Sequence, residues 1–154
     1  MKTSRGTIQA GRFEVPYRVY GQQENLLVCV SGAMQTMSIW RSVVKRFCGE
    51  YTVVLFDMPG VGRSRIVSGG AHVTVDEQIA VLDALIRQVR RRGELTLAGS
   101  SWGTAIAASY AAGHPEAVQC LLLSSFGMRP NAGMEYVVKR ATELYQARDY
   151  AGGA

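Results

Sequence analysis

The hydrophobic positions of this 154-residue chain fall into two patterns. Short, continuous apolar runs are typical of strands buried on both faces of a sheet, and four occur, at 26–30, 52–56, 95–98 and 118–123. Amphipathic or small-residue stretches between and after these runs predict helices, at 39–47, 75–89, 104–112 and 131–150. Strands that alternate with helices in this order predict an α/β fold, with a mostly parallel sheet and helices on both of its faces.

The first twenty residues depart from this alternation. Residues 7–10 and 13–20 predict an antiparallel hairpin, with Gly11-Arg12 at its turn. The second strand of the hairpin has apolar residues at alternate positions, namely Phe13, Val15, Tyr17 and Val19. Pro16 lacks the N–H that a central strand would donate, so its presence favours an edge position for this strand.

Two of the predicted helices have recognisable starts. Thr74 and Glu77 have the spacing of a capping box at the start of the long helix. Ser38 is the predicted N-cap of the helix over 39–47. The apolar stripe of the long helix, which we expect to face the core, comprises Val75, Ile79, Leu82, Ile86 and Val89.

The most informative motif is the pentapeptide at 99–103, Gly-Ser-Ser-Trp-Gly, which has the form G-x-S-x-G. It lies between a predicted strand and a predicted helix, the context of a nucleophile elbow that lifts a serine hydroxyl above the sheet. The two glycines are expected where strand and helix approach too closely for a β-carbon. Ser101 is therefore the candidate nucleophile, and a Gly/Ser turn without chemistry is the alternative.

A serine nucleophile needs hydrogen-bond donors for the oxyanion of its intermediate. The backbone N–H of Trp102, directly after Ser101, is the first candidate. The second is expected in the loop at 31–34, where Gly32 lets the backbone turn closely and the N–H of Ala33 is the predicted donor. A glycine that serves only the loop's turn is the alternative.

A serine nucleophile also needs a general base, usually a histidine oriented by a carboxylate. After Ser101 the only histidine is His114 and the only aspartate is Asp149. About ten helical residues at ~1.5 Å rise place His114 roughly 15 Å from Ser101, which favours a structural role at the helix end. His72 is predicted at the active edge of the sheet, but it precedes Ser101, against the usual order of nucleophile, acid and histidine.

Other side chains have two interpretations each. Asp57 follows a predicted strand and could be an acid or a metal ligand, but the proline and glycines after it favour a turn former. Four methionines could line an acyl pocket or fill gaps in the core, namely Met34, Met37, Met128 and Met134. Of these, Met34 and Met128 are the predicted substrate-binding residues.

Composition excludes several classes of protein. No apolar run approaches the ~18 residues of a membrane span, and no hydrophobic region of a secretory signal follows the basic N-terminus, so we expect a cytoplasmic protein. Cys29 and Cys120 lie in apolar strands, which predicts reduced core thiols. No cysteine has metal-ligand spacing to another, and we expect neither a metal nor another cofactor.

The net charge of +5 is densest at the end of the long helix. Its arginines there are Arg87, Arg90, Arg91 and Arg92. Cations at this place complement the helix dipole and face water, and docking of an acidic partner is the alternative. No nucleic-acid-binding motif accompanies the charge.

These residues resemble the α/β-hydrolase superfamily across nearly the whole chain. Within it, the pattern is similar to the bacterial 3-hydroxyacyl transferases that supply rhamnolipid and polyhydroxyalkanoate synthesis. The similar segments are 31–34, 53–59 with Arg63-Ser64, 100–103, and 124–126 with Asn131, Met134, Tyr136 and Arg140.

The resemblance implies an acyl-enzyme on Ser101, formed from an ester or from a 3-hydroxyacyl thioester of acyl carrier protein or coenzyme A. It implies that residues 1–128 are the N-terminal part of a hydrolase core and that 129–154 start a helical lid. The family's acid and histidine follow that lid, so we expect these 154 residues alone to be inactive and the strand at 118–123 to be an exposed apolar edge. A general carboxylesterase or thioesterase and a non-catalytic binding module are the alternatives.

Overall fold

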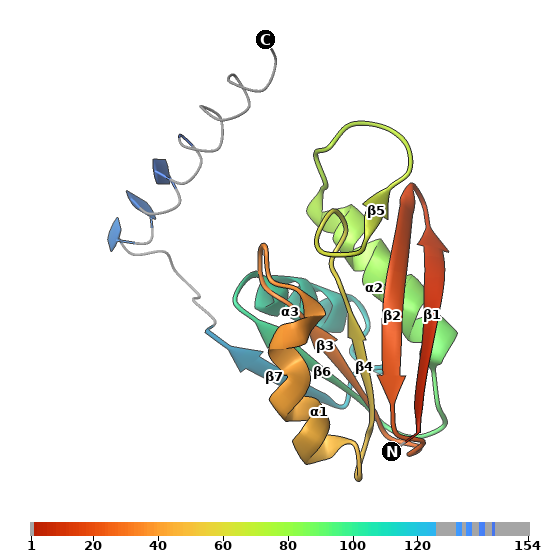
Figure 1. Cartoon of the computed structure of the whole chain (residues 1–154). Helices are drawn as coiled ribbons and strands as arrows, with labels where there is room; N and C mark the ends of the chain where they lie inside the picture. Colours follow the sequence, from red (N-terminus) through yellow and green to blue (C-terminus); the bar gives the residue numbers. More distant parts are fainter. Residues whose placement is uncertain (1, 126–131, 134, 137–138, 141–142, 144–154) are drawn as a thin grey trace.

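The computed structural model describes residues 2–125, 132–133, 135–136, 139–140 and 143. A seven-stranded sheet organises them, in the order β1-β2-β4-β3-β6-β7, with β5 paired to β2 (Figure 1). The strands are β1 (Thr3–Ala10), β2 (Phe13–Tyr20), β3 (Leu26–Val30), β4 (Thr52–Phe56), β5 (Arg65–Ile66), β6 (Leu95–Ser100) and β7 (Cys120–Ser124). The predicted α/β class and the N-terminal hairpin are confirmed.

The strand directions define one edge of the sheet as the place for a site. β1, β2 and β4 pair antiparallel in succession, whereas β4, β3, β6 and β7 run parallel to one another. The loops that follow β3, β4, β6 and β7 therefore meet at the same carboxyl edge, where open parallel sheets bind their ligands.

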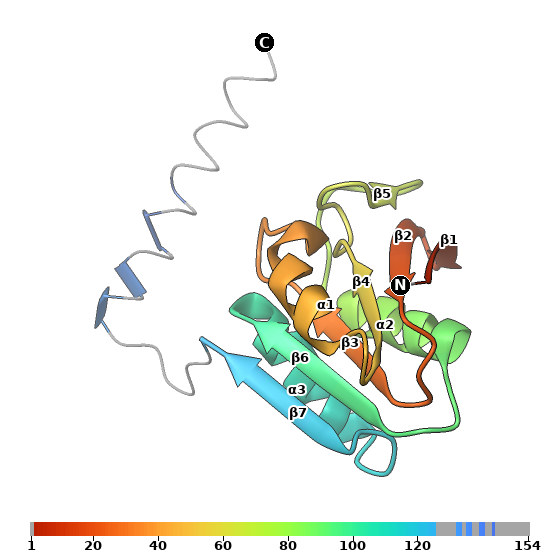
Figure 2. The same cartoon turned by 60° about the horizontal axis from the view of Figure 1, so that its bottom comes forward.

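Helices cover both faces of the sheet, as predicted. α2 (Val75–Val89) and α3 (Trp102–Gly113) pack on one face, and the 3-10 helix η1 (Met37–Trp40) with α1 (Arg41–Phe47) packs on the other (Figure 2). Residues of β3 alternate between the two cores, since Val28 contacts the α2–α3 side and Cys29 the η1–α1 side. Alternation of this kind explains why every residue of β3 and β4 is buried, and why all of them except Thr52 are apolar.

Several local predictions need correction. The first strand begins at Thr3 rather than at residue 7. The helix predicted over 39–47 begins as η1 after Thr36, so Ser38 is not an N-cap, and its hydroxyl bonds instead to that of Thr36 at 2.7 Å. The capping box of Thr74 and Glu77 is confirmed.

The edge position predicted from Pro16 is wrong. β2 lies inside the sheet, between β1 on one side and β4 with β5 on the other. On the second side, β5 pairs with residues 13–14 and β4 with residues 17–20. Pro16 falls in the gap between these two partners, where no ladder hydrogen bond needs its missing N–H.

The core-facing stripe of α2 is centred differently from its prediction. The buried residues are Val81, Leu82, Leu85, Ile86 and Val89. Val75, at the first turn, is 40% exposed, and Ile79 is only partly buried. The helix covers the sheet with its C-terminal half, so the apolar residues of the first turn extend beyond it.

The strand predicted at 118–123 also differs from its prediction. β7 begins at Cys120, and its residues alternate between exposed and half-buried rather than being buried. It is the last strand in the sheet order, and Leu122 is 51% exposed, so the predicted exposed apolar edge is confirmed. Cys120 is exposed, not a core thiol, whereas Cys29 is buried as predicted.

Candidate active site

Ser101 lies at the turn between β6 and α3, at the carboxyl edge of the sheet. Its backbone has φ +50° and ψ −120°, a conformation that residues other than glycine rarely adopt. Its N–H donates to the carbonyl of Ser124 at 2.9 Å, and its carbonyl accepts from the N–H of Thr104 at 2.9 Å. The neighbouring strand and the helix thus hold the turn from both sides, while the serine side chain stays exposed.

The glycines on either side of Ser101 lie where the backbone is most crowded. A β-carbon on Gly99 would stand 2.7 Å from the carbonyl oxygen of Gly103. A β-carbon on Gly103 would stand 2.6 Å from the carbonyl oxygen of Ser31 and would also meet that of Val30. The close approach predicted for the elbow is therefore present.

The loop after β3 lies directly against the elbow. A β-carbon on Gly32 would be 3.0 Å from the β-carbon of Ser101. Gln35 fixes this loop, because its side-chain Oε1 accepts from the N–H of Gly32 at 2.9 Å and its own N–H donates to the Gly32 carbonyl at 3.2 Å. Sequence reasoning missed Gln35, although a glutamine three residues after a loop glycine is the signal that could have found it.

The two predicted oxyanion donors, the N–H groups of Ala33 and Trp102, belong to the loop after β3 and to the start of α3. Ala33 is exposed, and within the described residues its N–H makes no backbone hydrogen bond. Trp102 is the first residue of α3, so its N–H has no partner inside the helix. Among the described residues, neither N–H group therefore has a hydrogen-bond partner.

The base of this loop is buried. Ser31 is fully buried, and its hydroxyl accepts a hydrogen bond from the indole N–H of Trp40 at 3.0 Å. Trp40 belongs to η1 and packs in the core on that face of the sheet. The start of the loop is therefore anchored to the helix layer beneath it.

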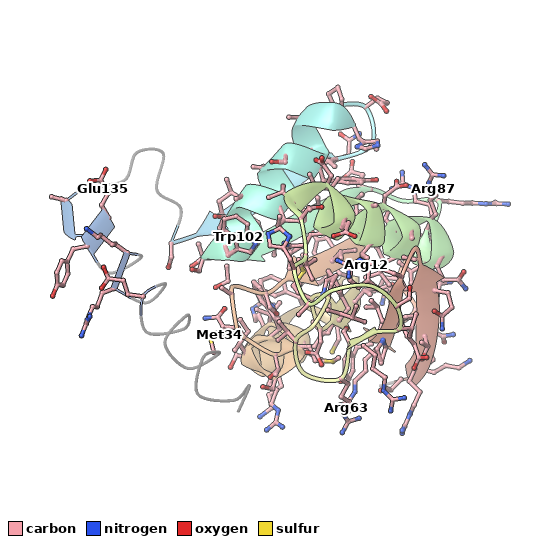
Figure 3. The ribbon with its side chains drawn as sticks, turned by 90° about the horizontal axis from the view of Figure 1, so that it is seen from above. Arg12, Met34, Arg63, Arg87, Trp102 and Glu135 are labelled. Carbon is pink, nitrogen blue, oxygen red and sulfur yellow. The ribbon has the colours of Figure 1, made fainter. Side chains whose placement is uncertain are left out.

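Met34, in the loop after β3, and Trp102, at the start of α3, lie on the same side of the molecule (Figure 3). Met34 has φ +59° and is 88% exposed, so it does not fill a gap in the core. The indole N–H of Trp102 donates to the side-chain oxygen of Gln78 in α2 at 2.9 Å, which fixes a ring that is 42% exposed. Met37, in contrast, is a core residue, and Met128 and Met134 lie outside the described residues.

Within the described residues, no hydrogen bond joins a histidine ring to Ser101. The Nδ1 atom of His114 lies 2.9 Å from the carbonyl of Tyr110, and the two rings stack at 4.2 Å. The twelve residues of α3 place His114 roughly 18 Å from Ser101, which agrees with a structural role. His72 is exposed, and Asp149 lies outside the described residues.

The carboxylate of Asp57 joins two segments of the chain through hydrogen bonds, in agreement with its interpretation as a turn former. Its Oδ1 accepts from the N–H of Met37 at 2.7 Å, and its Oδ2 accepts from the N–H of Arg63 at 3.0 Å. The residue is 97% buried by these loops, with 3% of its surface exposed. Both carboxylate oxygens are engaged, which leaves no oxygen directed at a substrate.

Arg12 organises the segment before α2, a role that the sequence did not indicate. Its guanidinium pairs with Glu77 at 2.7 Å and also binds the carbonyls of Ser68, Gly70 and His72. The hydrogen bond to Arg12 lowers the pKa of Glu77 from 4.5 to about 2. Arg12 thereby links the hairpin turn to the N-terminus of the helix that holds Gln78.

The arginines at the end of α2 lie at the other edge of the sheet. Arg90, Arg91 and Arg92 surround a shallow hollow with Glu24, just before β3. The six residues of β6 separate this edge from Ser101 by about 20 Å. An acidic partner docked there would stand at the opposite edge from the nucleophile.

Two further findings on the described residues concern metal binding and membrane spanning. No three His, Cys, Asp or Glu side chains within them gather closely enough to hold a metal ion. The helices among them are each too short or too polar to cross a bilayer.

A mostly parallel sheet with a strained serine between strand β6 and helix α3, and with a glycine two residues to either side of that serine, defines a chain of the α/β-hydrolase type. A family model described as the alpha/beta hydrolase fold matches residues 25–148, and the chain belongs to that family.

Relatives of known function differ in what they act on. The chain is 26% identical over 125 residues to epoxide hydrolase 4 of Mus musculus, across 81% of this chain and 34% of that protein. It is 29% identical over 111 residues to the pimeloyl-[acyl-carrier protein] methyl ester esterase of Salmonella heidelberg, across 71% of this chain and 40% of that protein. The crystal structure of a membrane phospholipase A matches with a TM-score of 0.74 and 29% identity, across 89% of this chain and 45% of that one. The chain thus spans less than half the length of each of these three relatives.

Proposed function

We propose that Ser101 forms an acyl-enzyme and that the protein transfers the acyl group of an ester or thioester. The observation that carries this proposal is the strained backbone of Ser101, at φ +50°, with the N–H groups of Ala33 and Trp102 nearby and without a partner among the described residues. Strain of this kind persists only where the surrounding structure imposes it, and it is typical of catalytic sites.

The chemistry follows from these groups. The Ser101 oxygen attacks the carbonyl carbon of the substrate, and its proton passes to a general base. The carbonyl oxygen becomes an oxyanion that accepts hydrogen bonds from the two N–H groups. The intermediate then expels the alcohol or thiol, and water or a second acceptor takes the acyl group from Ser101. In this proposal Ser101 is the nucleophile, and Ala33 and Trp102 supply the oxyanion donors.

The substrate class is the second part of the proposal. The resemblance to 3-hydroxyacyl transferases favours a 3-hydroxyacyl thioester of acyl carrier protein or coenzyme A, and an esterase relative that by its name acts on an acyl-carrier-protein ester supports a carrier-bound acyl group. The exposed thioether of Met34 would line the acyl site, as would Met128. Hydrolysis, as in a general carboxylesterase or thioesterase, is the same chemistry with water as acceptor.

The nucleophile is tested by labelling the protein with a serine-directed phosphonate and measuring the intact mass. We expect one adduct that Ser101→Ala abolishes and that Ser100→Ala, a matched change one residue away, retains. Incubation of the whole enzyme with 3-hydroxyacyl carrier protein then distinguishes water from a second molecule as the acceptor of the acyl group. Free acid as the only product would contradict transfer and leave hydrolysis.

A non-catalytic binding role is the second candidate, and the observation that favours it is that neither described histidine is hydrogen-bonded to Ser101. Phosphonate labelling that Ser101→Ala leaves unchanged would support this role. The division into a core over 1–128 and a lid from 129, like the cytoplasmic location, stays a prediction.

A further inference from the structure

A basic hollow lies on the η1–α1 side of the sheet, next to the hairpin, and the proposed acyl transfer does not use it. Its volume is about 240 Å³, and its lining includes Arg18 of β2, Arg41 of α1 and Arg63 of the loop after β4. An adjoining hollow of about 150 Å³ shares Arg18 and Arg63 and adds Arg5 of β1. Four arginines from four segments therefore line two adjoining hollows, which share Arg18 and Arg63. Figure 3 shows Arg63 projecting outward on the side of the hairpin.

The charges of these arginines are not balanced by neighbouring acids. Arg5 and Arg18 stand directly opposite each other in the hairpin register, an arrangement that destabilises a strand pair through repulsion. Within the described residues, none of the four arginines makes an ion pair, whereas Arg12, Arg46 and Arg87 each pair with a carboxylate.

Two acids lie nearby, and within the described residues neither makes an ion pair with the four arginines, so the hollow keeps an excess of positive charge. Asp57 is among the lining residues, but its carboxylate is buried and accepts from two backbone N–H groups. Glu14 is on the same face of β2 as Arg18, four residues away, which is about 13 Å along a strand. It accepts instead from Gln9 at 3.4 Å. The repulsion between Arg5 and Arg18 is therefore expected to be relieved by an anion from outside the chain.

The chemistry of the lining favours phosphate among anions. Guanidinium groups bind phosphate oxygens bidentately, and Thr36 and Ser38 add hydroxyl groups to the same lining. The hollow is smaller than the roughly 300 Å³ at which sites for whole organic ligands begin, so its size suits a phosphate group with the rest of the ligand outside. We propose that this arginine hollow binds the phosphate group of a phosphate ester, either a soluble one or a lipid headgroup.

The test measures binding of inorganic pyrophosphate to the full chain by calorimetry at low ionic strength. Arg18→Gln with Arg63→Gln should weaken binding at least tenfold, since each arginine contributes a charge-assisted hydrogen bond. The matched control, Arg91→Gln with Arg92→Gln, removes the same charge from exposed arginines at the other edge of the sheet and should change affinity less than twofold. Equal weakening by both pairs, or no measurable binding, would overturn the proposal.

Two further arms identify the source of the phosphate and separate this site from the acyl site. If the ligand is a soluble phosphate ester, ADP should compete with pyrophosphate. If it is a lipid headgroup, vesicles that contain phosphatidic acid should compete. The proposal is overturned if neither competes. Ser101→Ala should bind pyrophosphate with unchanged affinity, so the hollow can be confirmed even if Ser101 proves to be no nucleophile. Displacement of pyrophosphate only by an acidic peptide would show a protein-docking surface instead.

Discussion

Replacement of Gly103 by alanine tests the tight contact on which the elbow depends. Gly103 is the second residue of α3, and it lies against the carbonyl groups at the end of β3 and the start of the oxyanion loop. The added β-carbon would stand 2.6 Å from the carbonyl oxygen of Ser31 and 2.7 Å from the carbonyl carbon of Val30. Ordinary van der Waals contact of a β-carbon begins near 3.4 Å. Relief therefore requires the helix and the strand to separate by several tenths of an ångström.

The loss of stability expected for Gly103→Ala depends on which atoms have to move. Forcing a methyl group into a packed core costs about 1–3 kcal/mol when side chains can adjust. Here both obstructing groups are backbone atoms of a fully buried strand, so we expect a loss at the upper end, about 3 kcal/mol. For a chain of this length such a loss lowers the melting temperature by about 6–12 °C.

Gly113→Ala is the matched control, because it makes the same change at the other end of the same helix. Nothing lies within 4 Å of a β-carbon at Gly113, so alanine should stabilise the helix by about 0.5–1 kcal/mol. Urea unfolding followed by circular dichroism measures both variants. A Gly103→Ala variant within 1 kcal/mol of the parent protein would refute the close approach of α3 to β3 and with it the geometry of the elbow.

Three other perturbations test contacts around the site. Because Arg12 holds the pKa of Glu77 at about 2 rather than 4.5, the folded state gains stability from this carboxylate above pH 4.5 and loses it as the pH falls toward 2. Glu77→Gln should therefore flatten the decline of the urea midpoint over that range, and an unchanged slope would contradict the ion pair. Asp57→Ala leaves two loop N–H groups without an acceptor and should cost about 2–4 kcal/mol in urea unfolding, and a cost below 1 kcal/mol would argue against these two hydrogen bonds. Burial raises the pKa of the Cys29 thiol, so in a Cys48→Ser background Ellman's reagent should modify Cys120 quickly in the native protein and Cys29 only after unfolding. In that background, a fast reaction that survives Cys120→Ser would be inconsistent with these exposures.

Much of the site could be predicted because its signals are local. The glycines at 99 and 103, the serine between them and the apolar strand before them lie within one short segment, and each has one stereochemical reason for its place. The capping box at Thr74 and Glu77 is local for the same reason. Features built from distant segments were missed, such as the Arg12–Glu77 pair across 65 residues of sequence and the bond from Trp102 to Gln78.

The sequence by itself determined the kinds of element and their order, because hydrophobic periodicity and turn residues act over a few neighbours. It therefore sufficed for the α/β class, the hairpin, the elbow and the identity of Ser101 as the candidate nucleophile. Only the tertiary structure decided that the last described strand begins at Cys120 and how deeply each of its residues is buried, since the burial of β7 depends on what packs beside it and not on its own composition. The tertiary structure also decided the position of Pro16, because β4 and β5 pair with β2 on either side of it and leave a gap there. It decided the arginine hollow as well, because the register of β2 against β1 places Arg5 opposite Arg18.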